Sequence, residues 1–215
     1  MPLVDKPLSE LLHYPGINPR PADFDEYWDS ALRELDAHSP EVELRPNPVI
    51  PLRNAECFDL WFTGIGGARV YAKYLRPKRV EKPAPAIVAF HGYSGDSGAW
   101  NERLSYVSEG FCVAALDCRG QGGRSGDVIE TRGNTLRGHI IRGLEDEDPR
   151  NLYYRQVFLD TVLLTRIVMG FEEVDADRVG AMGGSQGGAL TIAEAMARPF
   201  ETTFSGPVAG AVASA

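Results

Sequence analysis

The sequence predicts an α/β fold in which a mostly parallel sheet is flanked by helices. Short, continuously apolar runs at residues 86–90, 111–116 and 178–182 are typical of strands buried on both faces of a parallel sheet. They alternate with helix-compatible segments, such as residues 101–109 between the first two runs. The longest of these segments spans about residues 151–169 and carries an apolar stripe, which we expect to cover one face of the sheet.

The segment before this core predicts a helix. Its apolar residues recur at intervals of three and four between Phe24 and Leu35, the spacing of one face of an amphipathic helix. Asp23 is placed to cap the N-terminus, with Glu26 as the second member of a capping box. We expect this helix to lie against the body of the protein.

Between this helix and the core, the pattern indicates an extended connector and a hairpin. Four prolines between residues 38 and 51 exclude a regular helix there. Strand-like runs follow at residues 57–63 and 69–76. The glycine-bearing loop at residues 64–67 separates them, and it can adopt the positive φ angles of a tight connection.

These elements together predict a single domain over residues 1–215. It comprises an N-terminal extension over residues 1–52, a core over residues 53–198 and an atypical tail over residues 199–215. The last ten residues are almost entirely Gly, Ala, Val and Ser.

The composition excludes several classes of partner. The net charge is -8 and the 22 basic residues are scattered, so nucleic acid is not expected as a partner. The N-terminus lacks a basic segment followed by an apolar one, and no apolar run approaches the roughly 18 residues that span a bilayer. We therefore expect a cytoplasmic protein with no membrane partner. The 3 cysteines lack metal-ligand spacing, so we expect reduced, buried thiols and no metal.

The strongest chemical signal is the sequence Gly-Gly-Ser-Gln-Gly at residues 183–187, which fits the G-x-S-x-G pattern of a nucleophile elbow. Because the chain has 23 glycines, the pattern alone is weak evidence. Its context is the one that the motif requires, since an apolar strand enters it and a helix-compatible segment at residues 189–198 leaves it. Small residues are needed on either side because the serine backbone is strained and the neighbouring elements are close. We predict Ser185 as the nucleophile of an α/β-hydrolase fold.

A second signal is His91-Gly92-Tyr93, directly after an apolar strand. In α/β-hydrolases the loop at this place donates one backbone N–H to the oxyanion hole, and the residue after the nucleophile donates the other. We predict Tyr93 and Gln186 as these donors, with the Tyr93 ring available to wall the acyl pocket. We expect His91 to order its own loop by hydrogen bonds rather than to act as the catalytic base.

The glycine-rich stretch at residues 117–125 is a third signal. It follows a strand but has neither the P-loop pattern nor Rossmann spacing, so phosphate binding is not favoured. We expect Arg119 and Gln121 to brace the loops around the elbow, while the glycines allow tight turns.

This ordered set of motifs resembles the acetyl xylan esterase/cephalosporin C deacetylase family over about residues 5–198. The segments that carry the resemblance are residues 21–28, the hairpin, residues 91–93, Arg-Gly-Gln-Gly-Gly at residues 119–123, Tyr-Tyr-Arg at residues 153–155, and residues 183–188. The resemblance implies a cytoplasmic serine esterase that removes acetyl groups from xylo-oligosaccharides and cephalosporin C. It also implies a homo-oligomer, a hexamer whose sites face an internal cavity. Neither a metal nor a cofactor is called for.

One departure from the family affects the expected activity. The family's triad Asp and His follow the nucleophile, whereas His13, His38, His91 and His139 all precede Ser185. We therefore expect a chain truncated after the elbow helix, with little ester hydrolysis of its own. Two alternatives stay open: a non-catalytic remnant of an α/β-hydrolase, and an α/β-hydrolase with another ester or peptide specificity.

Overall fold

The computed structural model describes residues 6–14, 17, 20–48, 51–79, 83–132, 136–197 and 202–204. In this part of the chain, seven strands form one sheet in the order β1-β2-β3-β5-β4-β6-β7. The strands are β1 (Glu43–Pro46), β2 (Ala55–Thr63), β3 (Arg69–Pro77), β4 (Ala84–Phe90), β5 (Cys112–Asp117), β6 (Val174–Gly183) and β7 (Thr202–Phe204). The helices and 3-10 turns of the same residues are α1 (Leu8–Leu11), α2 (Phe24–Asp36), η1 (Ile65–Gly67), η2 (Trp100–Arg103), α3 (Leu104–Ser108), η3 (Pro149–Asn151), α4 (Tyr153–Met169) and α5 (Gln186–Ala197).

The sheet is mixed. Strand β4 pairs in parallel with β5 and β6, and β6 pairs in parallel with β7. The β2–β3 hairpin is antiparallel and joins the parallel part through β5, where Tyr71 lies opposite Asp117. The three apolar runs of the sequence are therefore the parallel centre of the sheet, as predicted, and the hairpin lies beside them. All of β5 is buried, as expected for a strand covered on both faces.

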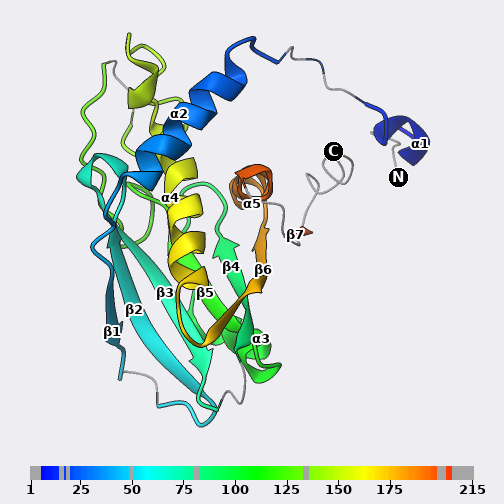
Figure 1. Ribbon diagram of the computed structural model, residues 1–215, viewed down its shortest axis with the longest axis vertical. Coiled ribbons are helices and arrows are strands. Elements are labelled where there is room, and N and C mark those ends of the chain that lie inside the picture. Colours follow the sequence, from blue (N-terminus) through cyan, green and yellow to red (C-terminus); the bar gives the residue numbers. More distant parts are fainter. Residues whose placement is uncertain are drawn as a thin grey trace.

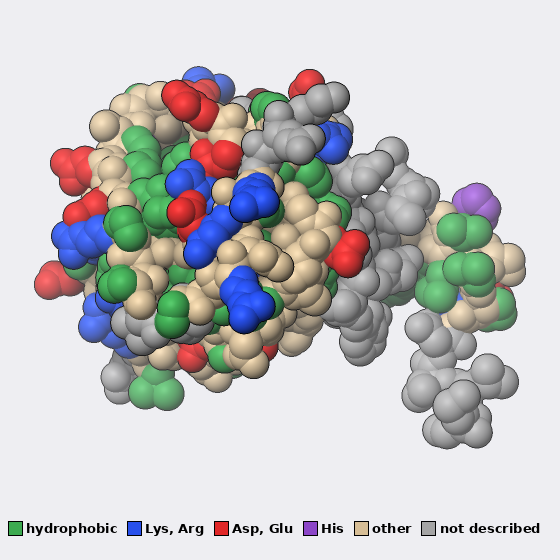
Figure 2. Space-filling model, turned by 90° about the horizontal axis from the view of Figure 1, so that it is seen from below, with side chains coloured by type: hydrophobic (Ala, Val, Ile, Leu, Met, Phe, Trp, Pro, Cys, Tyr) green, Lys and Arg blue, Asp and Glu red, His purple; other side chains and the backbone are tan. Residues whose placement is uncertain are grey.

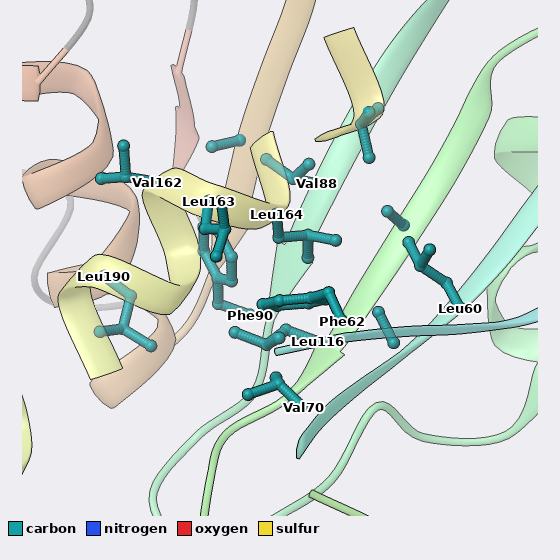
Figure 3. Close-up of a cluster of buried hydrophobic side chains, with 14 of the residues drawn as sticks. Leu60, Phe62, Val70, Val88, Phe90, Leu116, Val162, Leu163, Leu164 and Leu190 are labelled. Carbon is teal, nitrogen blue, oxygen red and sulfur yellow. The ribbon is translucent and has the colours of Figure 1, made fainter. Parts of the chain in front are cut away.

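Helices cover both faces of the sheet (Figure 1). Helices α4 and α5 pack over β4 and β6, with α2 lying across α4, while α3 packs on the opposite face against β3 and β5. The alternation of β3 divides its side chains between these layers, because Val70 and Ala72 join the core under α4 whereas Leu75 joins the smaller core under α3. Figure 3 shows Leu163 and Leu164 of α4 reaching the side chains of the strands. The predicted fold class is confirmed.

The predicted N-terminal helix forms and lies against the body. Helix α2 contacts α4 through the rings of Trp28 and Phe158, whose centroids are 5.6 Å apart in an edge-on arrangement. Glu34 also accepts a hydrogen bond of 2.7 Å from Arg155 of α4. The capping prediction is wrong, because Asp23 occupies the N-cap position but makes no side-chain hydrogen bond to the helix. Its φ of -95° and ψ of 8° lie outside the extended region from which a cap side chain usually reaches back.

The connector between α2 and the hairpin contains a strand that the sequence pattern does not reveal. Residues 43–46 form β1, which pairs antiparallel with β2 so that Glu43 lies opposite Trp61. The prolines exclude a helix, as predicted, but Pro46 at the end of an edge strand is compatible with pairing on one side. The connector therefore extends the sheet by one strand.

A buried ion pair fixes the loop after β5 to helix α4. The Arg119 guanidinium donates to the two carboxylate oxygens of Asp160 at 2.6 and 2.5 Å, and both side chains are almost completely buried. Burial raises the pKa of Asp160, and the facing guanidinium opposes that rise. A third donor of Arg119 bonds the Ile65 carbonyl oxygen at 3.0 Å in the hairpin turn. Arg119 thus ties three segments together, with its charge paired as a buried charge requires.

Several expectations from composition can be compared with the described residues. Cys57, Cys112 and Cys118 are buried free thiols, as predicted. No described helix has the length and apolarity to cross a membrane. Lys and Arg side chains lie among Asp and Glu side chains on the face that Figure 2 shows, which agrees with their scattered distribution in the sequence.

Candidate active site

Ser185 stands at the turn between strand β6 and helix α5, as the elbow motif predicts. Its φ is 55°, a left-handed conformation that non-glycine residues seldom adopt, and the residue is exposed. Strain of this kind persists only where the surroundings hold it, and it concentrates at functional sites. The strand and the helix therefore present the Ser185 side chain outward at the carboxyl end of the parallel strands.

The elbow is held by two glycines that leave no room for a side chain. A Cβ atom on Gly183 would overlap the Gly187 backbone, and a Cβ atom on Gly187 would overlap the Phe90 carbonyl oxygen at the end of β4. The close approach brings the start of α5 against the end of β4. It explains the glycine at each end of the motif by steric fit, as predicted from the sequence.

The loop after β4 lies directly beside the serine. A Cβ atom on Gly92 would lie 3.9 Å from the Ser185 Cβ atom, which is ordinary van der Waals contact, so the Gly92 backbone is a close neighbour of the serine. Tyr93 follows with 46% of its surface exposed, whereas Gln186 on the other side of Ser185 is buried. The structure thus brings all three predicted site residues, Ser185, Tyr93 and Gln186, to one place.

His91 is committed to its own loop. Its Nε2 atom accepts a hydrogen bond of 2.9 Å from the Cys118 amide, and its Nδ1 atom lies 2.7 Å from the Gly92 carbonyl oxygen. Since Nε2 accepts, Nδ1 carries the hydrogen that is donated to this oxygen. Both ring nitrogens are used, and the prediction that His91 orders the loop is confirmed.

Gln121 connects the two halves of the site. Its Oε1 atom accepts a hydrogen bond of 2.9 Å from the Ser94 amide, in the loop that carries Tyr93. Its side-chain amide pairs with that of Gln186, with N–O distances of 2.9 and 3.1 Å. The bracing role expected for Gln121 is therefore confirmed: one side chain bonds both the loop after β4 and the residue after Ser185.

Tyr153 supports this brace from helix α4. Its hydroxyl group donates a hydrogen bond of 2.6 Å to the Arg119 carbonyl oxygen and accepts one of 3.1 Å from Gln121 Nε2. Burial raises the pKa of Tyr153, so the hydroxyl group keeps its proton and remains a donor at neutral pH. The first turn of α4, the Arg119 loop and the elbow are joined in this way.

His139 is a neighbour of the site that the sequence reasoning missed. Its ring lies edge-on to the Tyr93 ring, with centroids 6.2 Å apart. The preceding residue, Gly138, has a φ of 74° and packs so closely on Gly120 that a Cβ atom there would overlap the Gly120 carbonyl oxygen. In the sequence, only the glycine before His139 hinted at a close contact there. Nothing in the pattern indicated that residues 138–139 lie beside residues 93 and 120.

The remaining histidines lie elsewhere. His38 Nε2 is 2.6 Å from the Thr63 carbonyl oxygen, and His13 follows helix α1, which lies away from the sheet (Figure 1). Across the described ranges, no cluster of three or more His, Cys, Asp or Glu side chains is arranged to hold a metal ion.

Comparison with known proteins adds an independent line of evidence. The family model for acetyl xylan esterase (AXE1) matches residues 1–203. A crystal structure of acetyl xylan esterase 1 from Thermoanaerobacterium sp. JW/SL YS485 is similar, with 52% identity and a TM-score of 0.86, over 93% of this chain and 62% of that one. An acetyl xylan esterase from Paenibacillus sp. R4 is 35% identical with a TM-score of 0.81, over 88% of this chain and 60% of that one.

A curated relative gives the same indication. The acetyl esterase Axe7A of Xylanibacter ruminicola is 27% identical over 190 residues, which cover 85% of this chain and 42% of that protein. The chain thus spans less than two thirds of the length of each of these three relatives.

The elbow geometry predicts that substitution of two adjacent glycines in helix α5 by alanine has different effects on stability. Gly187→Ala is expected to destabilise the protein by at least about 2 kcal/mol, because its methyl group would be forced into the backbone of β4. Gly188→Ala is the matched control, since a Cβ atom there would lie 3.6 Å from the Gly183 carbonyl oxygen. It should be neutral or stabilising by up to about 1 kcal/mol through helix propensity. Urea denaturation measures both, and equal effects would contradict the packing described.

Proposed function

Because the chain belongs to the acetyl xylan esterase family, we propose that it forms the nucleophile-bearing part of a serine esterase that removes acetyl groups from small acetylated carbohydrates. Xylo-oligosaccharides and esters of the cephalosporin C type are the proposed substrates. One observation carries the proposal: Ser185 is exposed at a φ of 55°, next to the loop that carries Tyr93. The names of the similar proteins support the acetyl group as the acyl part.

The proposed reaction begins with attack of Ser185 Oγ on the acetyl carbonyl carbon. A histidine takes the serine proton and later passes it to the departing sugar oxygen, leaving an acetyl-serine that water hydrolyses to acetate. Negative charge develops on the carbonyl oxygen only in the tetrahedral state, so fixed N–H dipoles stabilise that state more than the bound ester. The backbone amides of Tyr93 and Gln186 are the proposed donors.

We propose that the histidine of this mechanism belongs to a segment that the similar esterases have outside the part matched by this chain. His91 uses both of its ring nitrogens in its loop, and His38 bonds the hairpin. His139 lies against the Tyr93 ring. In the described residues, no histidine or carboxylate has a hydrogen bond to Ser185 Oγ, and activation of a serine needs a base within about 2.6 to 3.2 Å.

Chemical labelling tests the nucleophile. A serine-reactive organophosphate is expected to modify Ser185 in a version of the protein with the full length of its relatives, and peptide mass mapping identifies the modified residue. Ser185→Ala should abolish both labelling and hydrolysis of p-nitrophenyl acetate, a loss on the order of 10⁶-fold by comparison with other serine hydrolases. Labelling of another serine, or full activity in Ser185→Ala, would refute the assignment.

Assembly is a further part of the proposal and rests on the family resemblance. We propose a cytoplasmic homo-oligomer, and light scattering on the full-length version is expected to give the mass of about six subunits. The expectation is that apolar surface is covered between subunits, as in obligate assemblies. A monomer at micromolar concentration would remove this part of the proposal and leave the chemistry of Ser185 untouched.

A further inference from the structure

The loop over residues 136–144 lies against the candidate active site, although it is distant from the elbow in the sequence. Gly138 packs on the loop after β5, because a Cβ atom there would overlap the Gly120 carbonyl oxygen and lie 3.2 Å from Gln121 Cγ. The Gln121 side chain in turn bonds the side chain of Gln186, which follows the nucleophile. This chain of contacts places the 136–144 loop beside the elbow.

The 136–144 loop is also fixed at a second point. Arg142 donates hydrogen bonds to the buried Asp127 carboxylate and, at 2.6 Å, to the Ile129 carbonyl oxygen. The Arg142 carbonyl oxygen accepts a hydrogen bond of 2.9 Å from the Tyr153 amide at the start of α4. The loop is therefore held between the segment after β5 and helix α4, and the side chains that it carries toward the site are held with it.

His139 is the side chain that this loop brings to Tyr93. Its ring is partly buried and lies edge-on to the Tyr93 ring, with an interplanar angle of 89° and centroids 6.2 Å apart. Edge-on pairs at such distances attract each other, because the positive edge of one ring meets the negative face of the other. The Nδ1 atom of His139 is buried and has no hydrogen-bond partner among the described residues. What this ring provides is therefore its packing against Tyr93.

The position of the Tyr93 ring depends on this contact. The residue is 46% exposed, so burial alone does not select one side-chain rotamer. Its backbone is fixed separately, because the Ser94 amide that follows it donates a hydrogen bond of 2.9 Å to Gln121 Oε1. Loss of the His139 ring would free the Tyr93 ring to rotate about its side-chain bonds and leave the Tyr93 amide in place. The ring and the amide are thus held by different contacts.

We propose that His139 is a positioning residue, which holds the Tyr93 ring as a wall of the acyl pocket and so restricts the esterase to small acyl groups such as acetyl. The proposal rests on the proposed function, in which the Tyr93 amide binds the carbonyl oxygen of the ester. The acyl chain is attached to the same carbonyl carbon, so it lies beside residue 93. A longer acyl chain needs the space that the supported ring occupies.

The acyl-chain selectivity of a full-length version of the protein tests this role. The measured quantity is kcat/KM for p-nitrophenyl butyrate divided by kcat/KM for p-nitrophenyl acetate. His139→Ala is expected to raise this ratio about tenfold, since one methylene group is worth about 10- to 200-fold in an apolar pocket. His139→Phe keeps a flat ring without the unpartnered nitrogen and should preserve the ratio. His13→Ala is the matched control, because it makes the same substitution at an exposed position away from the sheet.

A double-mutant cycle tests whether His139 acts through the Tyr93 ring. Tyr93→Ala removes the ring and keeps the backbone amide, so it should raise the ratio by itself at least as much as His139→Ala. In the Tyr93→Ala background, His139→Ala should have no further effect on the ratio, because the two residues are coupled. The Tyr93→Ala variant also tests the wall if His139→Ala does not fold, and circular dichroism establishes which variants are folded.

Three outcomes would overturn the proposal: an unchanged ratio in folded His139→Ala or Tyr93→Ala, an equal change in His139→Phe, or an effect of His139→Ala that persists without the Tyr93 ring. Organophosphate labelling of Ser185 separates this result from the esterase proposal. Labelling that all variants retain, together with an unchanged ratio, rejects only the role of His139. Absence of Ser185 labelling in the unsubstituted protein rejects the proposed function itself.

Discussion

One side chain, that of Gln121, bonds both loops of the candidate site. The elbow and the loop after β4 come from different parts of the chain, and no described side chain of either loop bonds the other. Gln121 joins them by accepting from the Ser94 amide and pairing with the Gln186 side chain. An oxyanion hole needs donors fixed before the reaction begins, because reorganisation during the reaction would cost the stabilisation they provide. The Gln121 brace supplies that rigidity.

The brace is itself held in place by Arg119 and Tyr153. Arg119, two residues earlier, is paired with Asp160 inside the protein and bonds the hairpin turn at Ile65. The Tyr153 hydroxyl group donates a hydrogen bond to the Arg119 carbonyl oxygen and accepts one from the Gln121 side chain. Buried ion pairs of this kind contribute little net stability, but breaking one leaves an uncompensated charge. The pair therefore fixes the position of Arg119, and with it the position of the glycine-rich loop after β5.

Much of this could be predicted from the sequence, because the signals are local. The apolar runs of β4, β5 and β6 and the glycines around Ser185 follow from burial and steric fit, and the family resemblance is confirmed by the match over residues 1–203. What could not be predicted depends on distant contacts. The edge strand β1 is defined by its pairing with β2, and His139 lies beside Tyr93 where Gly138 packs on Gly120. The Asp23 cap was predicted from a sequence pattern that does not determine the backbone conformation. The backbone at the start of α2 has a conformation in which the Asp23 side chain makes no capping hydrogen bond.

Gln121→Ala in the full-length protein tests most directly whether Gln121 positions the proposed oxyanion donors, the amides of Tyr93 and Gln186. Steady-state kinetics with p-nitrophenyl acetate should show kcat lowered about 10- to 100-fold with KM nearly unchanged, because the donors act mainly in the transition state. Thermal unfolding followed by circular dichroism establishes that the variant is folded. A folded Gln121→Ala variant with unchanged kcat, or with a loss confined to KM, would contradict the account.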